Sequence, residues 1–246
     1  MVKHGDIVAK ERILWLPKGD HTAEEYEDAA FVSETGTWPL RAAVADGATE
    51  SVFARDWANR LVRGVAQSEG LNADSFPQQL RDWQNAFLQQ HQQQQPREGE
   101  RAWYAERKAE EGAFATLLGL TVHRDRSWQA FSVGDCCLFH LRDNDVIAAW
   151  PFDDAEAFDD RPALVPSLSE RDAPSPKTHS GEWKLHDAFV LTTDALAAWL
   201  LDGGTPADLF SLPPDTFQEG VEAAREEGAL RDDDTTALTL RIKRSR

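Results

Sequence analysis

The sequence predicts an α+β fold. Short apolar segments rich in β-branched and aromatic residues come first, followed by two amphipathic helices, a block of further strands, and single helices that alternate with strands. Consecutive strands without a steady β-α-β alternation favour α+β over a doubly wound parallel sheet. The 246 residues are enough for a substantial core, and we expect a single domain over 1–246.

Nine segments have the composition of strands, and most are bounded by Asp, Gly or Asn. They are 13–16, 29–32, 40–45, 115–122, 128–133, 136–141, 146–150, 188–192 and 236–242. Asp143-Asn144-Asp145 separates two of these segments and predicts a hairpin turn.

Four helices are predicted from apolar residues at helical spacing. Ser51 can cap the first, and Ser75 and Pro77 open the second. The third covers about 195–201 and the fourth about 214–227. The apolar stripes of the first two helices are Phe53, Trp57, Leu61 and Val65, and then Leu80, Trp83 and Phe87.

Two stretches have no regular pattern. The Gln-rich run 89–95 predicts a helix end that frays into a loop. Residues 154–180 are rich in Asp, Pro and Ser and predict a long surface excursion.

The charge balance excludes several classes of protein. Asp and Glu total 43 against 26 Lys and Arg, a formal net charge of −17, which argues against general nucleic-acid binding. The basic residues Arg241–Arg246 are expected to form a solvated tail. No apolar run approaches the roughly 20 residues of a membrane span, and the N-terminus lacks a signal-peptide pattern. The adjacent Cys136 and Cys137 cannot form a disulfide framework, so we expect a cytoplasmic protein.

Aspartates stand at four strand ends, where apolar residues would be expected. Asp46 ends L-R-A-A-V-A-D-G, Asp135 follows W-Q-A-F-S-V-G, and Asp194 follows A-F-V-L-T-T. Asp233 and Asp234 precede the strand T-T-A-L-T-L-R-I. Carboxylates gathered in this way would repel one another, and a hard divalent cation with oxygen ligands would remove the repulsion.

Each aspartate alone also fits a structural role. Asp before Gly is a common turn, and Asp before an apolar helix is a common N-cap. Most other carboxylates are expected only to keep the surface soluble. On the residues alone, a Mg²⁺ or Mn²⁺ site and a set of independent turns and caps both remain open.

Six short motifs occur in a fixed order along the chain. They are Y-E-D-A (26–29), V-A-D-G (44–47), G-A-F-A-T (112–116), V-G-D (133–135), L-T-T-D-A-L (191–196) and D-D-T-T (233–236). Together they resemble the metal-dependent type 2C (PPM-type) protein phosphatases, in a divergent, bacterial-like form. The resemblance covers about 10–242 and implies a four-layer α-β-β-α sandwich of two antiparallel sheets flanked by helices. It also implies hydrolysis of phosphoserine and phosphothreonine in proteins.

The resemblance assigns metal-binding roles residue by residue. Asp46 matches the aspartate that bridges two metals, and Gly47 matches the glycine that offers its carbonyl oxygen. Glu27 and Asp28 match the acidic pair of the first strand, where the glutamate holds a metal through water. Asp135 matches an aspartate that helps bind a third metal in bacterial members.

The remaining ligands come from the C-terminal half. Asp194 matches the aspartate of the family's T-D-G element. Asp233 matches the aspartate of the final D-N or D-D motif, with Asp234 in second place. The register is ambiguous by one residue within 232–234, and Asp233 is preferred because it brings Thr236 into step with the family strand.

The resemblance also implies the cofactors and the chemistry. Two or three Mg²⁺ or Mn²⁺ ions would be held, and two of them would activate a water that attacks phosphorus directly. Asp46, Asp194 and Asp233 are the residues expected to be catalytic. The implied partner is a phosphorylated protein with a cognate Ser/Thr kinase, without nucleic acid or membrane, and the chain is expected to be a monomer.

Several positions depart from the family pattern. No arginine precedes the acidic pair to hold the phosphate, and Lys18 or His21 would be a poorer clamp. Residues 48–50 offer no general acid after Asp46-Gly47. The family's T-D-G reads Thr193-Asp194-Ala195 in this sequence, which keeps the aspartate ligand. Cys136 and Cys137 replace the serine and arginine that usually follow Gly-Asp in the family. We expect both cysteines to be buried strand residues.

These departures keep two further hypotheses open. One is a phosphatase-like module that binds metal or phosphopeptide with little or no turnover. The other is a purely structural interaction domain, which would bind no metal.

Overall fold

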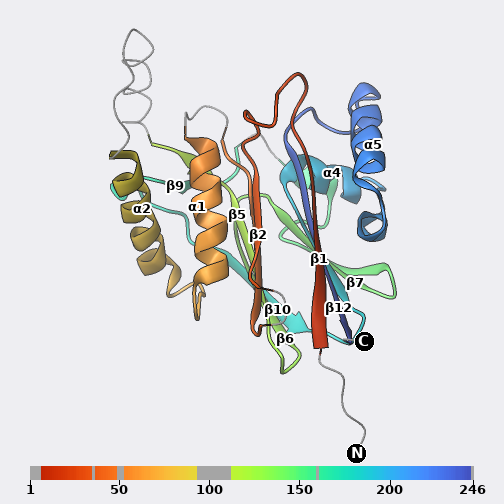
Figure 1. Ribbon diagram of the computed structural model, residues 1–246, viewed down its shortest axis with the longest axis horizontal. Coiled ribbons are helices and arrows are strands. Elements are labelled where there is room, and N and C mark those ends of the chain that lie inside the picture. Colours follow the sequence, from red (N-terminus) through yellow and green to blue (C-terminus); the bar gives the residue numbers. More distant parts are fainter. Residues whose placement is uncertain (1–6, 35–36, 49–52, 93–111, 159–160, 245–246) are drawn as a thin grey trace, which may run out of the picture.

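Two five-stranded antiparallel sheets form the centre of the structure. The computed structural model describes residues 7–34, 37–48, 53–92, 112–158 and 161–244 (Figure 1). The first sheet has the order β1 (Ile7–Leu16), β12 (Thr235–Arg244), β11 (Ala188–Thr192), β7 (Cys137–Arg142), β8 (Asp145–Trp150). The second has the order β10 (Lys177–Glu182), β6 (Ser127–Val133), β5 (Leu117–Val122), β3 (Leu40–Ala45), β2 (Ala29–Val32). A short pair, β4 (Phe114–Ala115) and β9 (Val165–Pro166), lies beside them.

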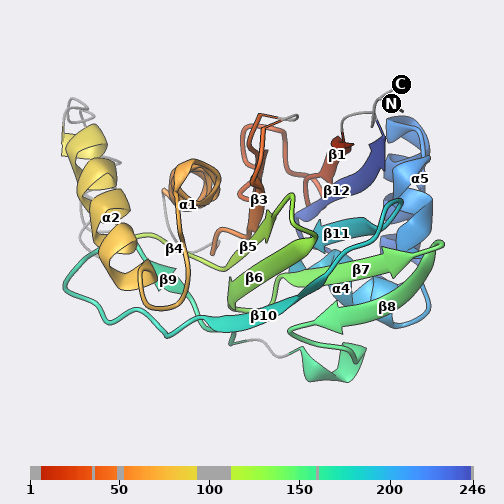
Figure 2. The ribbon, with the colours of Figure 1, turned by 90° about the horizontal axis from the view of Figure 1, so that it is seen from below.

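Helices cover the outer face of each sheet (Figure 1, Figure 2). Helices α1 (Ala54–Gln67) and α2 (Phe76–Gln92) pack on the second sheet. Helices α4 (Asp194–Leu201) and α5 (Pro214–Glu226) pack on the first sheet. The described chain also contains two short 3₁₀ helices, η1 (Ala155–Ala157) and η2 (Pro206–Phe210). The expected four-layer α-β-β-α sandwich is therefore confirmed.

Side-chain alternation along the strands builds the layers. In β3, Leu40 and Val44 enter the core between the sheets, while Ala43 and Ala45 face the helical layer. In β12, Leu238 and Leu240 enter the same intersheet core, while Ala237 faces the other helices. Successive strand residues point to opposite faces of the sheet, and both faces of these central strands are covered. Each central strand therefore carries apolar residues on both of its faces.

The predicted elements lie close to the observed ones, and the turn at 143–145 is confirmed. Asp143 and Asn144 have positive φ angles of 55° and 71°, as a tight β7–β8 hairpin requires. Strand β1 begins at Ile7, earlier than predicted. The predicted cap Ser51 lies outside the described residues, and α1 begins after Phe53. The end of the Gln-rich run, 93–95, also lies outside them.

Two predictions from composition were wrong. Part of the expected excursion 154–180 is strand β10, which pairs with β6 from Lys177–Ser132 to Glu182–Ser127. Its sequence, K-T-H-S-G-E, is polar because β10 is an edge strand with mostly exposed side chains. The expected tail Arg241–Arg246 is strand β12 as far as Arg244, paired there with Ile7. None of the described helices has the length and apolar composition to span a bilayer.

The packing of the intersheet core predicts a large effect of a single truncation. Leu238 has no exposed surface, so Leu238→Ala should lower the free energy of unfolding by about 2–5 kcal/mol. Ile147→Ala on β8, where the side chain is 46% exposed, should change it by less than about 0.5 kcal/mol. Urea unfolding of both variants checks this, and equal losses would contradict the assignment of Leu238 to the core.

Candidate metal centre

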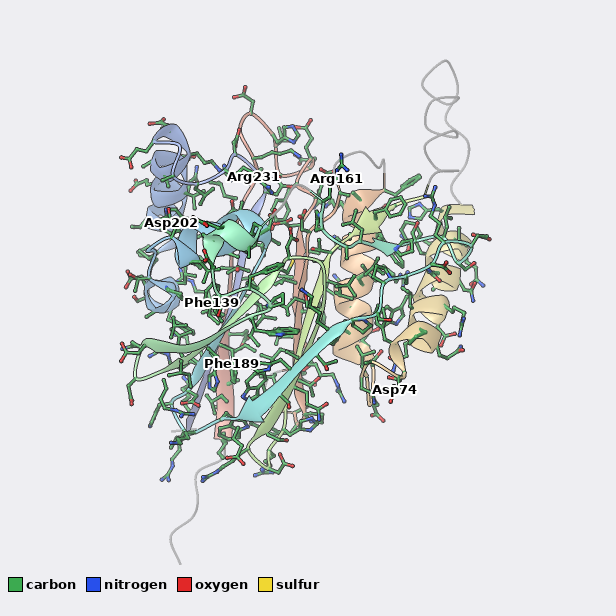
Figure 3. The ribbon with its side chains drawn as sticks, turned by 180° about the vertical axis from the view of Figure 1, so that it is seen from behind. Asp74, Phe139, Arg161, Phe189, Asp202 and Arg231 are labelled. Carbon is green, nitrogen blue, oxygen red and sulfur yellow. The ribbon has the colours of Figure 1, made fainter. Side chains whose placement is uncertain are left out.

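Antiparallel pairing brings the acidic motifs to one end of the sandwich. Strands β3, β6 and β11 end there, and β2 and β12 begin there, because each lies antiparallel to a neighbour. Asp46, Asp135 and Asp194 follow the three ending strands, while Asp28 and Asp234 precede the two beginning ones. Acidic residues far apart in the sequence therefore meet at this end of the sandwich. Figure 3 shows the labelled Arg231 and Arg161 at this end, away from Phe189 in the sandwich.

Three of the expected ligands form a compact cluster. Asp46, Asp135 and Asp194 each offer a carboxylate oxygen, and these oxygens all lie within 4.8 Å of one another. Asp135 and Asp194 are buried and Asp46 is half-buried. Burial raises the pKa of Asp46 well above its ordinary value, and the charges of Asp28 and Asp194 raise it further. Burial also raises the pKa of Asp194.

The G-A-F-A-T motif fixes the backbone of Asp46. The Asp46 N–H donates to Thr116 Oγ1 at 3.1 Å, and the Thr116 N–H donates to the Asp46 carbonyl at 2.9 Å. The next residue, Gly47, is closely packed, since a Cβ there would lie 2.7 Å from the Glu27 carbonyl oxygen. Glycine is therefore required where the two acidic segments cross. Gly134, before Asp135, has a φ of 100°, which also favours glycine.

Asp28 faces inward and is held by hydroxyl groups. Thr193 Oγ1 and Thr236 Oγ1 donate to Asp28 Oδ2 at 2.9 and 2.6 Å, and the Tyr26 hydroxyl is hydrogen-bonded to Thr236. Asp28 Oδ1 is buried with no hydrogen-bond partner among the described residues. Burial raises the pKa of Asp28 well above its ordinary value, although the hydroxyls lower it. The structure thus places Asp28 in the inner wall of the site.

The aspartates before β12 have different partners. Asp234 is buried and accepts the backbone N–H groups of Lys18 and Glu27 at 2.9 and 2.6 Å. It therefore ties the segment between β1 and β2 to the start of β12. Asp233 is more exposed, and its Oδ2 accepts a hydrogen bond from Arg231 Nη2 at 2.9 Å. Asp233 thus reaches Arg231 while Asp234 is tied to the backbone, and the choice of Asp233 as a ligand stays a prediction.

Arg231 links two of the expected ligands. Its Nη2 donates both to Asp194 Oδ2 and to Asp233 Oδ2. Asp233 is thereby joined to the three-carboxylate cluster through one guanidinium group. No local pattern in the sequence signals that Arg231 would reach Asp194.

Glu27 lies at the rim of the site. Its Oε2 is 3.4 Å from Lys18 Nζ, and both side chains are 16% exposed. Lys18, one of the two proposed replacements for the missing arginine, is therefore paired with an expected ligand. The other, His21, is exposed.

A hollow beside Asp135 carries basic residues that the sequence did not single out. Its lining includes Gly134, Asp135, Arg161 and Lys177, and both basic residues are exposed. Arg161 lies in the expected excursion, and Lys177 begins β10. Topology alone brings them to the site, so no local pattern could have identified them.

The two cysteines are buried, as predicted, but only Cys137 is a strand residue, since β7 begins there and Cys136 directly precedes it. Burial raises the pKa of Cys137 to about 12. Cys136 Sγ lies 3.0 Å from Thr116 Oγ1, behind Asp46. Neither is a reactive thiol at neutral pH.

The donor set fits a hard divalent cation. The three clustered side chains are carboxylates, which are the ligands that Mg²⁺ and Mn²⁺ prefer. Burial and neighbouring acidic groups raise the pKa values of Asp46 and Asp194, so a cation beside them would favour their charged forms. The buried Asp28 Oδ1 adds a further oxygen without a hydrogen-bond donor in the described chain.

Comparisons with known proteins identify one family. A family model described as protein phosphatase 2C matches residues 21–235. Among solved structures, the Mycobacterium tuberculosis serine/threonine phosphatase PstP/Ppp matches with a TM-score of 0.66 at 14% identity, over 96% of this chain and 99% of that chain. The catalytic domain of PstP in complex with two manganese ions matches with a TM-score of 0.62 at 16% identity, over 96% and 99%.

A further match is the serine/threonine phosphatase Stp1 from Staphylococcus aureus. Its TM-score is 0.61 at 15% identity, over 95% of each chain. At these identities the structural likeness shows a shared fold. No curated protein sequence matches the chain.

The unbalanced carboxylates predict an unusual pH dependence of stability. A carboxyl whose pKa is raised by folding stabilises the folded state below its unfolded pKa, and this contribution is lost as the pH rises through the folded pKa. Asp46→Asn should therefore raise the melting temperature of the metal-free protein by a few degrees at about pH 7.5. The advantage over the wild type should shrink toward about pH 5, as Asp46 takes up a proton.

Thermal unfolding in EDTA checks this prediction. Asp145→Asn, at an exposed position in the β7–β8 hairpin, is the matched control and should not shift the melting temperature. A lower melting temperature for Asp46→Asn at both pH values would show that the Asp46 charge is balanced by the protein.

Proposed function

Because the chain belongs to the protein phosphatase 2C family, we propose that it is a metal-dependent protein phosphatase acting on phosphoserine and phosphothreonine. The observation that carries the proposal is the convergence of Asp46, Asp135 and Asp194 within 4.8 Å of one another at one end of the sandwich. Such a cluster is costly without cations, and its position matches the ordered motifs of the sequence.

The proposed cofactors are two or three Mg²⁺ or Mn²⁺ ions. Asp46, Asp194 and Asp233 would hold one ion, and Asp46, the Gly47 carbonyl and Glu27 a second. Asp135 would contribute to a third. When bound, the ions would activate a water as nucleophile and offset charge on the phosphoryl oxygens.

The protein's own residues position these groups. Asp234 fixes the backbone that carries Glu27, and Thr116 fixes the backbone of Asp46. Thr193 and Thr236 hold Asp28 behind the cluster. Rigid backbone and hydroxyl contacts therefore set the ligand positions before any substrate arrives, which reduces the reorganisation needed for reaction.

The proposed substrate is a phosphorylated protein, and the reaction requires a Ser/Thr kinase that phosphorylates it. A dianionic phosphate must approach a chain with a formal net charge of −17. Arg161 and Lys177, in the hollow with Asp135, supply positive charge on one side of the site. They support an anionic substrate at this end.

A second candidate is a phosphatase-like module that binds metal or phosphopeptide with little turnover. It is favoured by the pairing of the nearby cations. Lys18 is paired with Glu27, and Arg231 with Asp194 and Asp233. The sequence also has no arginine just before Glu27 and Asp28, where the family usually places the one that holds the phosphate.

Turnover measurements separate the candidates. With Mn²⁺, the purified protein should hydrolyse p-nitrophenyl phosphate and a phosphothreonine peptide, and EDTA should abolish both activities. Asp46→Asn should reduce turnover by more than about 100-fold, because it weakens the bridging ligand. Asp145→Asn should retain wild-type turnover.

Calorimetric titration with MnCl₂ completes the test. Manganese binding without metal-dependent turnover would favour the binding module, and the absence of both would refute the metal-centre proposal.

A further inference from the structure

Arg231 occupies two carboxylates of the proposed centre at once. A single nitrogen, Nη2, donates to Asp194 Oδ2 and to Asp233 Oδ2, the latter at 2.9 Å. Within the described part of the chain, the guanidinium makes its side-chain hydrogen bonds to these two carboxylates. The side chain is 50% exposed, so the guanidinium has a route to solvent.

Local structure aims Arg231 at the site. Leu230, its neighbour, is buried, and its N–H donates to the Ala224 carbonyl at the end of α5. The Asp233 N–H donates to the Arg231 carbonyl at 2.9 Å and closes a tight turn before β12. The backbone is therefore hydrogen-bonded on both sides of Arg231, and the side chain extends from it to the two carboxylates.

The other oxygen of each carboxylate is already bound by backbone. Asp194 Oδ1 accepts the Ala195 N–H at 2.6 Å, and Asp233 Oδ1 accepts the Asp234 N–H at 2.9 Å. The two oxygens that accept no backbone hydrogen bond are the two that Arg231 contacts. A divalent cation between these carboxylates would lie beside a guanidinium of like charge, and the two would repel each other.

We propose that Arg231 is an internal counter-cation, which holds Asp194 and Asp233 in the metal-free protein and must leave them when a divalent cation binds. The inference rests on the proposed metal centre. Arg231 thus stabilises the metal-free site and lowers its affinity for metal. Part of the binding free energy of the divalent cation is used to displace the Arg231 guanidinium.

The competition is measured by titrating the full chain with MnCl₂ in a calorimeter. Arg231→Gln should bind Mn²⁺ about tenfold more tightly than the wild type, because the competitor is removed. Its metal-free melting temperature should fall, and the rise on adding Mn²⁺ should be larger than in the wild type. Arg231→Lys, which keeps the charge and loses the planar group, should give an intermediate affinity.

Arg142→Gln is the matched control. Arg142 also binds a carboxylate, with Nε and Nη2 at 2.9 and 2.8 Å from Asp187, at the opposite ends of strands β7 and β11. This variant should lose stability with unchanged affinity for Mn²⁺.

The outcomes separate this inference from the function on which it rests. Unchanged or weaker Mn²⁺ binding by Arg231→Gln, with melting temperatures lowered equally with and without metal, would show that Arg231 is only structural. Absence of Mn²⁺ binding to the wild type and to both Arg231 variants would overturn the metal centre and this inference together.

Discussion

The structure depends on bringing several carboxylates together at one end of a sandwich. Strand direction makes this unavoidable, since β3, β6 and β11 end where β2 and β12 begin. The mutual repulsion of Asp46, Asp135 and Asp194 then sets the requirements on everything around them. Two hydroxyl groups bind the neighbouring Asp28, and a backbone amide and one guanidinium group bind Asp194, which balances part of the charge at this end. The raised pKa values of Asp46 and Asp194 indicate that the balance is incomplete.

In each pair of consecutive acidic residues, the two side chains lie in different environments and have different partners. Glu27 lies at the rim with Lys18, while Asp28 is buried against Thr193 and Thr236. The pair before β12 behaves in the same way, with one side chain tied to backbone N–H groups and the other reaching Arg231. Successive residues of an extended chain point to opposite sides, so an acidic pair supplies one inward and one outward group. Pairs of acids at strand ends are therefore more informative than single ones.

The sequence predicted the central strands, the four α-helices of the described residues and the family, because apolar alternation and the ordered motifs are local signals. It also placed the acidic motifs at strand ends. Strand β10 was missed because an edge strand needs no apolar face, and its pairing with β6 is decided by backbone hydrogen bonds. The contact between Arg231 and Asp194 joins positions 37 residues apart. Sequence could name both residues, but only the fold shows that they meet.

The chain is strongly acidic overall, so the few basic residues at this end determine whether the local field can attract an anion. A formal net charge of −17 repels a phosphate at long range, and salt screens that repulsion only beyond about 8–10 Å. At closer range the field is set by the nearest groups, which here include Arg231, Arg161 and Lys177. Two of these are exposed and the third is half exposed. Under the proposed function, a surface that repels phosphates in general would accept one at this site, provided that cations also neutralise the carboxylates beneath it.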